Sequence, residues 1–195
     1  MPASILLMLD LQNDLVHPDC PNGKSPLGAQ VHARQVVARA SASIANARAA
    51  GMPVGFVRVG FSDDYRECPP HSPVFSVAPK MGLFKLSAWG GALHPDLDAH
   101  PGDWQIIKHR VSPFYGTDLD LLLRNYGISR IACCGVSTQA VAQATVRDGH
   151  DRDFEMVVLE DCCAAHSAQE HANSIGSLQR FSQVMTSNDP WLAPA

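Results

Sequence analysis

The chain has 195 residues, 46% of them hydrophobic and 17% charged, which is enough apolar material for one globular domain with a sizeable core. Its net charge of −4 and its 15 scattered basic residues exclude the basic footprint expected of a nucleic-acid or acidic-membrane binder. We therefore predict a single domain over residues 1–195 whose partners are small molecules or copies of itself.

The first apolar run, Ile5 to Leu9, has no basic residue before it and Asp10 directly after it. The run is too short for a membrane span and lacks the charged start of a secretory signal, so we expect a cytoplasmic protein with no membrane partner. Six cysteines include the adjacent pairs 133–134 and 162–163, unlike the spaced cysteines of a disulfide framework, and we expect reduced thiols.

The first part of the chain predicts a β-α-β unit. Residues 4–9 are typical of a strand buried on both faces of a parallel sheet, and this strand ends on Asp10. After a polar loop, apolar residues recur at helical spacing over 31–47, and residues 54–59 predict the second strand. The following run, 60–103, has no clear periodicity and holds six prolines, so we expect a long excursion there.

This excursion carries more apolar surface than a loop can readily bury on its own subunit. Its large apolar side chains are Phe61, Val74, Phe75, Val77, Met81, Leu83, Phe84 and Trp89. We therefore expect the excursion to pack in part against another chain, and the protein to be a homodimer or homotetramer.

The second half of the chain alternates strands and helices. In order, we predict a strand at 104–108, a helix capped by Thr117 or Asp118, a strand at 131–134, a helix ending at Asp148, a strand at 155–159, a helix opened by the capping box 167–170 and a strand at 184–186. Six strands alternating with helices predict an α/β fold, a three-layer α/β/α domain with a six-stranded parallel sheet and right-handed crossovers.

Three polar features fall at the carboxyl ends of predicted strands: Asp10, Lys108 and the turn at Gly135. Ligands bind at this edge of an open α/β sheet, so we expect Asp10 and Lys108 to lie within hydrogen-bond or one-water reach. Burial would raise the pKa of Asp10 and the ammonium would lower it, which would poise the pair for proton transfer; the alternative is a solvated charge. The helix start after Gly135 could stabilise an oxyanion, although an ordinary β-α turn has the same pattern.

Three sequence motifs occupy these strand ends: Asp10-Leu11-Gln12-Asn13-Asp14, the run 108–114, and Gly135-Val136-Ser137-Thr138 leading to 145–148. Their order and spacing resemble the isochorismatase-like hydrolases, also called the cysteine hydrolase superfamily, over nearly the whole chain. The resemblance implies oligomeric subunits, a cis peptide between Val136 and Ser137, and an Asp-Lys-Cys triad that hydrolyses amides through a thioester. Asp10 and Lys108 match the first two members of that triad.

The third member is where the chain departs from the family. Counted from Gly135, the position of the nucleophilic cysteine falls on Val141, while Cys134 lies on the preceding strand. Isochorismatases proper also lack the cysteine, and in them the Asp is thought to protonate a vinyl ether before water completes the cleavage. They carry an aromatic residue and a histidine where this chain has 137–139, Ser-Thr-Gln, so we do not expect isochorismate as the substrate.

We therefore predict a hydrolase that acts on a small molecule by Asp/Lys-assisted, non-covalent cleavage of a vinyl ether or C–N bond. The alternative is a catalytically silent binder or scaffold that kept the fold. The catalytic candidates are Asp10 and Lys108. The candidates for contact with the substrate are Gln12, Trp89, Phe114, Tyr115, Ser137, Thr138 and Val141.

One stretch of the chain offers a candidate metal site. His94, Asp96, Asp98 and His100 offer four potential ligands in seven residues, but such residues in a Pro-rich loop are usually solvated. The resemblance implies that related nicotinamidases hold a metal through an Asp and a His after the second strand, where this chain has Val59-Gly60-Phe61. We expect neither a metal nor another cofactor.

Overall fold

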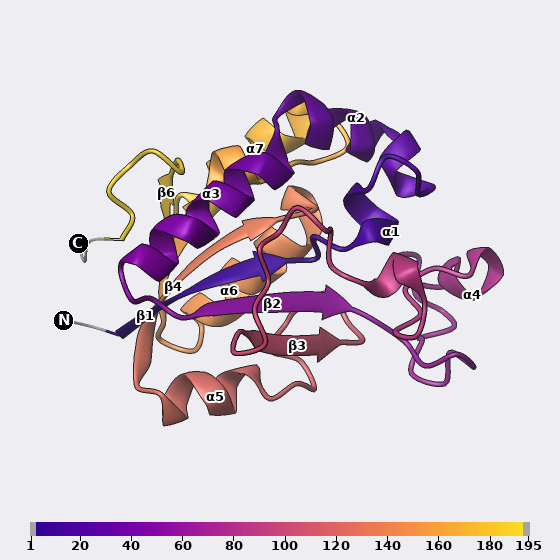
Figure 1. Cartoon of the computed structure of the whole chain (residues 1–195), viewed down its shortest axis with the longest axis horizontal. Helices are drawn as coiled ribbons and strands as arrows, with labels where there is room; N and C mark the ends of the chain where they lie inside the picture. Colours follow the sequence, from indigo (N-terminus) through magenta and orange to yellow (C-terminus); the bar gives the residue numbers. More distant parts are fainter. Residues whose placement is uncertain (1–2, 193–195) are drawn as a thin grey trace.

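The structure is a computed structural model, and residues 3–192 are described. Within them, six strands form one parallel sheet in the order β3-β2-β1-β4-β5-β6 (Figure 1). The strands are β1 (Ala3–Leu9), β2 (Val54–Val59), β3 (Trp104–Lys108), β4 (Ile128–Gly135), β5 (Glu155–Leu159) and β6 (Gln183–Met185). The predicted six-stranded parallel sheet is confirmed.

Helices flank this sheet on both faces. The helices of the described chain are α1 (Asn13–Val16), α2 (Pro26–Ala33), α3 (Val36–Ala49), α4 (Ala78–Met81), α5 (Leu119–Asn125), α6 (Gln143–His150) and α7 (Ala168–Leu178), with short turns η1 (Asn22–Lys24), η2 (Trp89–Gly91) and η4 (Glu160–Cys162) and a π-helical turn η3 (Thr138–Ala142). Right-handed crossovers place α3 on one face and α5, α6 and α7 on the other, and in Figure 1 α3 lies in front of the strands and α6 behind them. The sheet and the helices on its two faces form the three layers of the predicted α/β/α architecture.

The long helix predicted over 31–47 is two helices in the structure. Ser25 caps α2 by accepting a hydrogen bond from the Leu27 N–H at 3.2 Å, and Pro26 occupies the first turn. The break comes at Gln35, whose φ of 54° lies in the left-handed region and ends the helical path before α3 begins. Apolar spacing continues across the break, which is why the sequence pattern alone predicted one helix.

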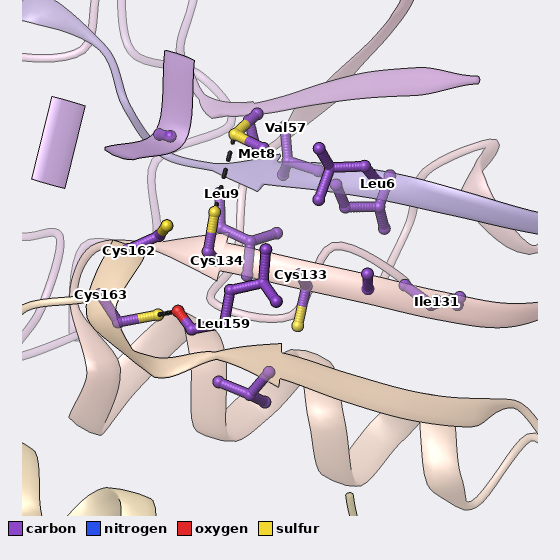
Figure 2. Packing of buried hydrophobic residues seen from close by; sticks show 14 of the residues in the cluster. Leu6, Met8, Leu9, Val57, Ile131, Cys133, Cys134, Leu159, Cys162 and Cys163 are labelled. Atoms are coloured by element: carbon purple, nitrogen blue, oxygen red, sulfur yellow. Dashed lines mark hydrogen bonds between the residues drawn. The ribbon is translucent and has the colours of Figure 1, made fainter. Parts of the chain in front are cut away.

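The centre of the core is built on β1 and β4, where most side chains are fully buried. Figure 2 shows Cys134 on the face of β4 towards Met8, with its Sγ 3.7 Å from the Met8 Sδ, and Cys133 on the opposite face. All six cysteines are free and buried, as expected. Burial raises the pKa of Cys133 to about 12, and hydrogen bonding to Cys162 together with burial raises that of Cys134 well above its usual range. These thiols stay neutral and unreactive near pH 7.

The excursion 60–103 contains α4 and η2 and otherwise follows an irregular path, as predicted. It builds a second apolar cluster against the end of β2, with Phe61, Phe75, Leu83 and Phe84 among its members. The Asp14 carboxylate on α1 fastens this cluster by accepting the Phe84 N–H at 2.6 Å. The excursion is thus packed onto the carboxyl edge of the sheet.

Several large apolar side chains of the excursion remain on the surface of the single chain. They are Val74, Val77, Met81, Leu86 and Trp89. Four of the excursion side chains expected to pack against another chain, Phe61, Phe75, Leu83 and Phe84, are buried within the subunit, and the oligomeric state stays a prediction. In the described part of the chain, no helix combines the length and the apolar character that crossing a membrane would need.

Candidate active site

The predicted contact between Asp10 and Lys108 is present. Asp10 follows β1 with a φ of 56°, a left-handed conformation that turns the chain away from the sheet, and Lys108 is the last residue of β3. The Lys108 Nζ lies 2.8 Å from the Asp10 Oδ2, and the two side chains are 2% and 6% exposed. The Lys108 Nζ also donates to the carbonyl oxygen of Arg110 at 3.1 Å. Two strand ends separated by β2 therefore meet through a buried ion pair.

The surroundings of Asp10 change its acidity. Burial raises the pKa of its carboxyl, and the charge and hydrogen bond of Lys108 lower it only in part, so the net pKa is above the ordinary value. Its second oxygen, Oδ1, is buried and has no hydrogen-bond partner within residues 3–192. A buried carboxyl with a raised pKa and one unused oxygen can exchange a proton with a bound molecule.

The turn after β4 places a backbone donor beside this pair. Gly135 has a φ of 139°, and a Cβ there would come within 2.0 Å of the Leu9 carbonyl oxygen, so only glycine fits. The peptide bond between Val136 and Ser137 is cis, as the family resemblance implied. Within the described chain, the Ser137 N–H donates to no acceptor, whereas the Thr138 N–H donates to the Ala164 carbonyl at 2.8 Å.

A cavity of about 480 Å³ joins the pair to the turn. Its polar lining residues are Asp10, Asn22, Lys108, Ser137, Gln139 and His166. The excursion contributes an apolar wall made of Val74, Phe75, Val77, Met81, Leu83 and Phe84 together with Pro73. A larger hollow of about 1060 Å³ lies beside α2 and α3, but neither Asp10 nor Lys108 lines it. The smaller cavity is therefore the candidate active site.

Four of the predicted site residues line this cavity: Asp10, Lys108, Ser137 and Val141. Gln12 does not, because its amide is fully buried and bonds both backbone groups of Val59, with Nε2 to the carbonyl and Oε1 to the N–H at 3.0 Å each. It ties the exit of β1 to β2 instead of facing a ligand.

Four further substrate-binding candidates also lie away from the cavity. Thr138 is fully buried behind the turn, with its hydroxyl 2.9 Å from a ring nitrogen of His171. Phe114 packs against the Phe154 ring in the main core, while Tyr115 and Trp89 are 66% and 55% exposed. The excursion forms the wall in place of these aromatic residues, because Phe114 is buried in the main core and Tyr115 and Trp89 are exposed.

Sequence reasoning missed three polar residues of the cavity, Asn22, Gln139 and His166. The Gln139 amide donates through Nε2 to the His166 Nδ1, and its Oε1 is buried without a partner in the described chain. Gln139 lies in the first turn after Gly135, which marks it as a residue near the helix start. His166 follows β5 by several residues, and no local pattern distinguishes it from a surface histidine.

A partly buried hydrogen-bond chain supports the turn from behind. His171 on α7 contacts the Thr138 hydroxyl through Nδ1 and the Glu160 carboxylate through Nε2 at 3.0 Å, and Glu160 pairs with Arg34 at 2.8 Å. Burial lowers the pKa of His171 despite the opposing effect of Glu160, so the ring is neutral. A carboxylate only accepts, so Nε2 carries the proton and Nδ1 accepts from the Thr138 hydroxyl.

The histidine and aspartate cluster of residues 94–100 is occupied by internal contacts. Arg48 binds Asp98 and Asp103 at 2.6 Å each, and the His94 Nδ1 accepts the Asp96 N–H at 3.2 Å. Across residues 3–192, no group of three or more His, Cys, Asp or Glu side chains is arranged to hold a metal ion.

A parallel α/β sheet with an aspartate–lysine pair and a free backbone donor in one cavity at its carboxyl edge defines an enzyme that acts on small molecules. Residues 4–189 match the family described as "Isochorismatase domain", and the chain belongs to this family of hydrolases.

Two relatives illustrate the family in sequence. The "Uncharacterized isochorismatase family protein YecD" of Escherichia coli O157:H7 is 41% identical over 166 residues, which cover 84% of this chain and 86% of that protein. The "Ureidoacrylate amidohydrolase RutB" of Methylorubrum extorquens is 34% identical over 193 residues, which cover 92% of this chain and 76% of that protein.

Solved structures show the same fold. An isochorismatase family protein from Desulfovibrio vulgaris superposes with a TM-score of 0.86 at 23% identity, covering 96% of this chain and 95% of that one. N-carbamoylsarcosine amidase from Thermoplasma acidophilum superposes with a TM-score of 0.77 at 22% identity, covering 96% and 98%. At this identity the likeness concerns the fold and assigns no substrate.

Proposed function

We propose that the protein hydrolyses a small molecule without a covalent enzyme intermediate, with Asp10 transferring the proton and water acting as nucleophile. One observation carries this proposal: Asp10 has a raised pKa and a free Oδ1 beside Lys108, in a cavity whose described lining contains no thiol. The family resemblance assigns the nucleophilic cysteine to position 141, and Val141 lines the cavity without a nucleophilic atom.

Each group has a role in this mechanism. For a C–N bond, water adds to the carbonyl carbon, the Ser137 N–H stabilises the developing oxyanion, and protonated Asp10 gives its proton to the leaving nitrogen. For a vinyl ether, Asp10 protonates the terminal vinyl carbon, and water adds to the resulting oxocarbenium carbon. The hemiketal formed in this way then collapses: its C–O bond to the alcohol breaks, the hydroxyl proton passes to the alcohol oxygen, and a carbonyl compound and an alcohol are released. In both cases Lys108 stabilises the carboxylate left on Asp10, and the carboxylate recovers its proton from the attacking water.

Two considerations bear on the bond that is cleaved. The likeness to a protein named ureidoacrylate amidohydrolase favours a C–N bond. The absence of a nucleophile favours a bond that needs only protonation, because water attack on an unactivated amide has a higher barrier than protonation of an enol ether. Both substrate types therefore belong in the first assays.

A cytoplasmic location and a homodimeric or homotetrameric assembly remain predictions.

The test is turnover of a panel of vinyl ethers, ureido compounds and amides before and after treatment with iodoacetamide. We expect the active substrates to be turned over equally well after alkylation, because the cysteines are buried and take no part in bond making. Inactivation by iodoacetamide with substrate protection and labelling of Cys134 alone would show that a cysteine is the nucleophile. Binding without turnover across the panel would favour a silent binder.

A further inference from the structure

The candidate cavity has very little positive charge available to a ligand. Across residues 3–192, Lys108 is the one lysine or arginine in its lining, and its Nζ already contacts the Asp10 Oδ2 and the Arg110 carbonyl. The Arg110 guanidinium does not line the cavity, because its Nη1 donates to the carbonyl oxygens of Glu67 and His109 at 3.0 and 2.6 Å. The ammonium is thus neutralised within the site.

The polar end of the cavity offers no cation that would replace the Lys108 ammonium. His166 bonds the amide of Gln139, and its ring lies 4.0 Å from the Glu170 carboxylate. Any positive charge on His166 is therefore already opposed by a neighbouring acid, and the side chain is about half exposed to water. Asn22, Ser137 and Gln139 present neutral groups.

The rest of the wall is apolar, and so is the side of the mouth that Val74 and Met81 form. Val74 and Met81 line the cavity and are also 55% and 52% exposed, so a ligand that enters past them leaves water for aliphatic side chains. Phe75, Leu83 and Phe84 continue the apolar surface inward and are nearly buried. An anionic group on the ligand body would lose its hydration there without gaining a counter-ion.

The charge of Asp10 also disfavours an anionic ligand. When ionised, Asp10 is balanced by Lys108 alone, and a second carboxylate in the cavity would leave one negative charge unpaired. We infer that the ligand of this cavity is an uncharged molecule with an apolar body, and that the site discriminates against carboxylate or phosphate groups on that body. This inference deepens the proposed function and rests on the same cavity.

The experiment uses binding, so that it does not depend on turnover. Saturated alkyl ethers, which this chemistry does not cleave, are prepared in pairs that differ only by a methyl or a carboxylate at the end remote from the ether oxygen. Calorimetric titration of the full chain should show the methyl compound binding at least tenfold more tightly, equivalent to about 1.4 kcal/mol. Equal or tighter binding of the carboxylate, or no binding of either at millimolar concentration, would overturn the inference.

A matched pair of variants locates the effect. Met81→Arg adds a cation at the mouth, and it should tighten carboxylate binding about fivefold to tenfold while leaving the methyl compound within twofold. Leu121→Arg on α5 adds the same charge at a 61% exposed position that does not line the cavity, and it should change neither affinity. An equal gain in both variants would mean that the preference comes from net charge and not from the cavity.

The two proposals fail in distinguishable ways. If neutral ligands bind preferentially but no member of the assay panel is hydrolysed, the inference about the ligand stands and the proposed reaction fails. If a carboxylate-bearing substrate is hydrolysed with the lowest KM of the panel, the reaction stands and the inference about ligand charge fails.

Discussion

The two sides of the candidate site are built in different ways. Asp10, Lys108 and Ser137 sit at the ends of β1, β3 and β4, where parallel pairing fixes each backbone to its neighbour. The facing wall comes from the excursion 60–103, whose path depends on turns and on the small cluster around Phe61 and Phe75. The groups proposed to react therefore lie on the rigid sheet edge. Changes in the excursion sequence can alter which molecule binds without moving those groups.

The largest expected effect comes from removing the proton donor on the sheet edge. Asp10→Asn keeps the shape but removes the titratable proton, so kcat should fall roughly 100- to 10,000-fold. The matched control is Asp98→Asn, which alters a carboxylate in the excursion whose side chain is 65% exposed and should retain activity. Steady-state kinetics on any substrate found active measures both, and full activity in Asp10→Asn would remove Asp10 from the mechanism.

The second-largest effect is expected from removing the hydrogen bonds of His171 behind the turn. His171→Ala leaves the Glu160 carboxylate and the Thr138 hydroxyl without their shared partner, and the free energy of unfolding should drop by about 1–3 kcal/mol. Because Thr138 lies between Ser137 and Gln139, we expect kcat to fall more than KM rises. Urea denaturation and kinetics measure the two effects, and His171→Gln, which can keep one hydrogen bond, should recover part of each. A loss of stability without any change in kcat would limit His171 to folding.

The third effect is a pH dependence that arises from Asp10 at the sheet edge. If Asp10 acts as the proton donor, kcat should fall as pH rises through its raised pKa. Stability should follow the same direction: the folded protein holds this proton more tightly than the unfolded chain, so the contribution is fully present below about pH 4 and is lost as pH rises through the folded-state pKa. Comparing wild type with Asp10→Asn at each pH isolates the contribution, and identical profiles would contradict it.

The smallest effect concerns the excursion wall. Val77→Ala removes two methyl groups from a side chain that lines the cavity and is 43% exposed, so KM should rise about threefold to tenfold with kcat nearly unchanged. Val37→Ala is the matched control, since Val37 lies by the larger hollow beside α3 and away from Asp10. A fall in kcat equal to the rise in KM would show that the wall also positions the reacting bond.

Sequence patterns predicted the sheet-edge side of this comparison better than the excursion side. Apolar runs that end on Asp10 and Lys108 imply parallel strands, and parallel strands bring their ends together, so the 2.8 Å contact follows from one-dimensional information. The excursion has no such periodicity. Its wall is set by long-range packing, and residues such as Val77 and Met81 could be recognised as apolar but not as neighbours of Lys108.

The aromatic candidates show the same limit in another form. Phe114 and Tyr115 were candidates for contact with the substrate, but the backbone direction after β3 decides where each side chain points. Phe114 enters the core beside Phe154, and Tyr115 faces solvent. The break at Gln35 was missed for a related reason, because a single left-handed residue leaves the apolar spacing around it unchanged.

Gln12 shows how a residue can influence catalysis without touching a ligand. Its side-chain amide pairs with the Val59 backbone as a peptide group would, and so adds one rung to the ladder between β1 and β2 just beyond Asp10. A variant at this position would weaken turnover and could be mistaken for the loss of a substrate contact. The melting temperature separates the two cases, since a missing rung lowers it in the absence of any ligand.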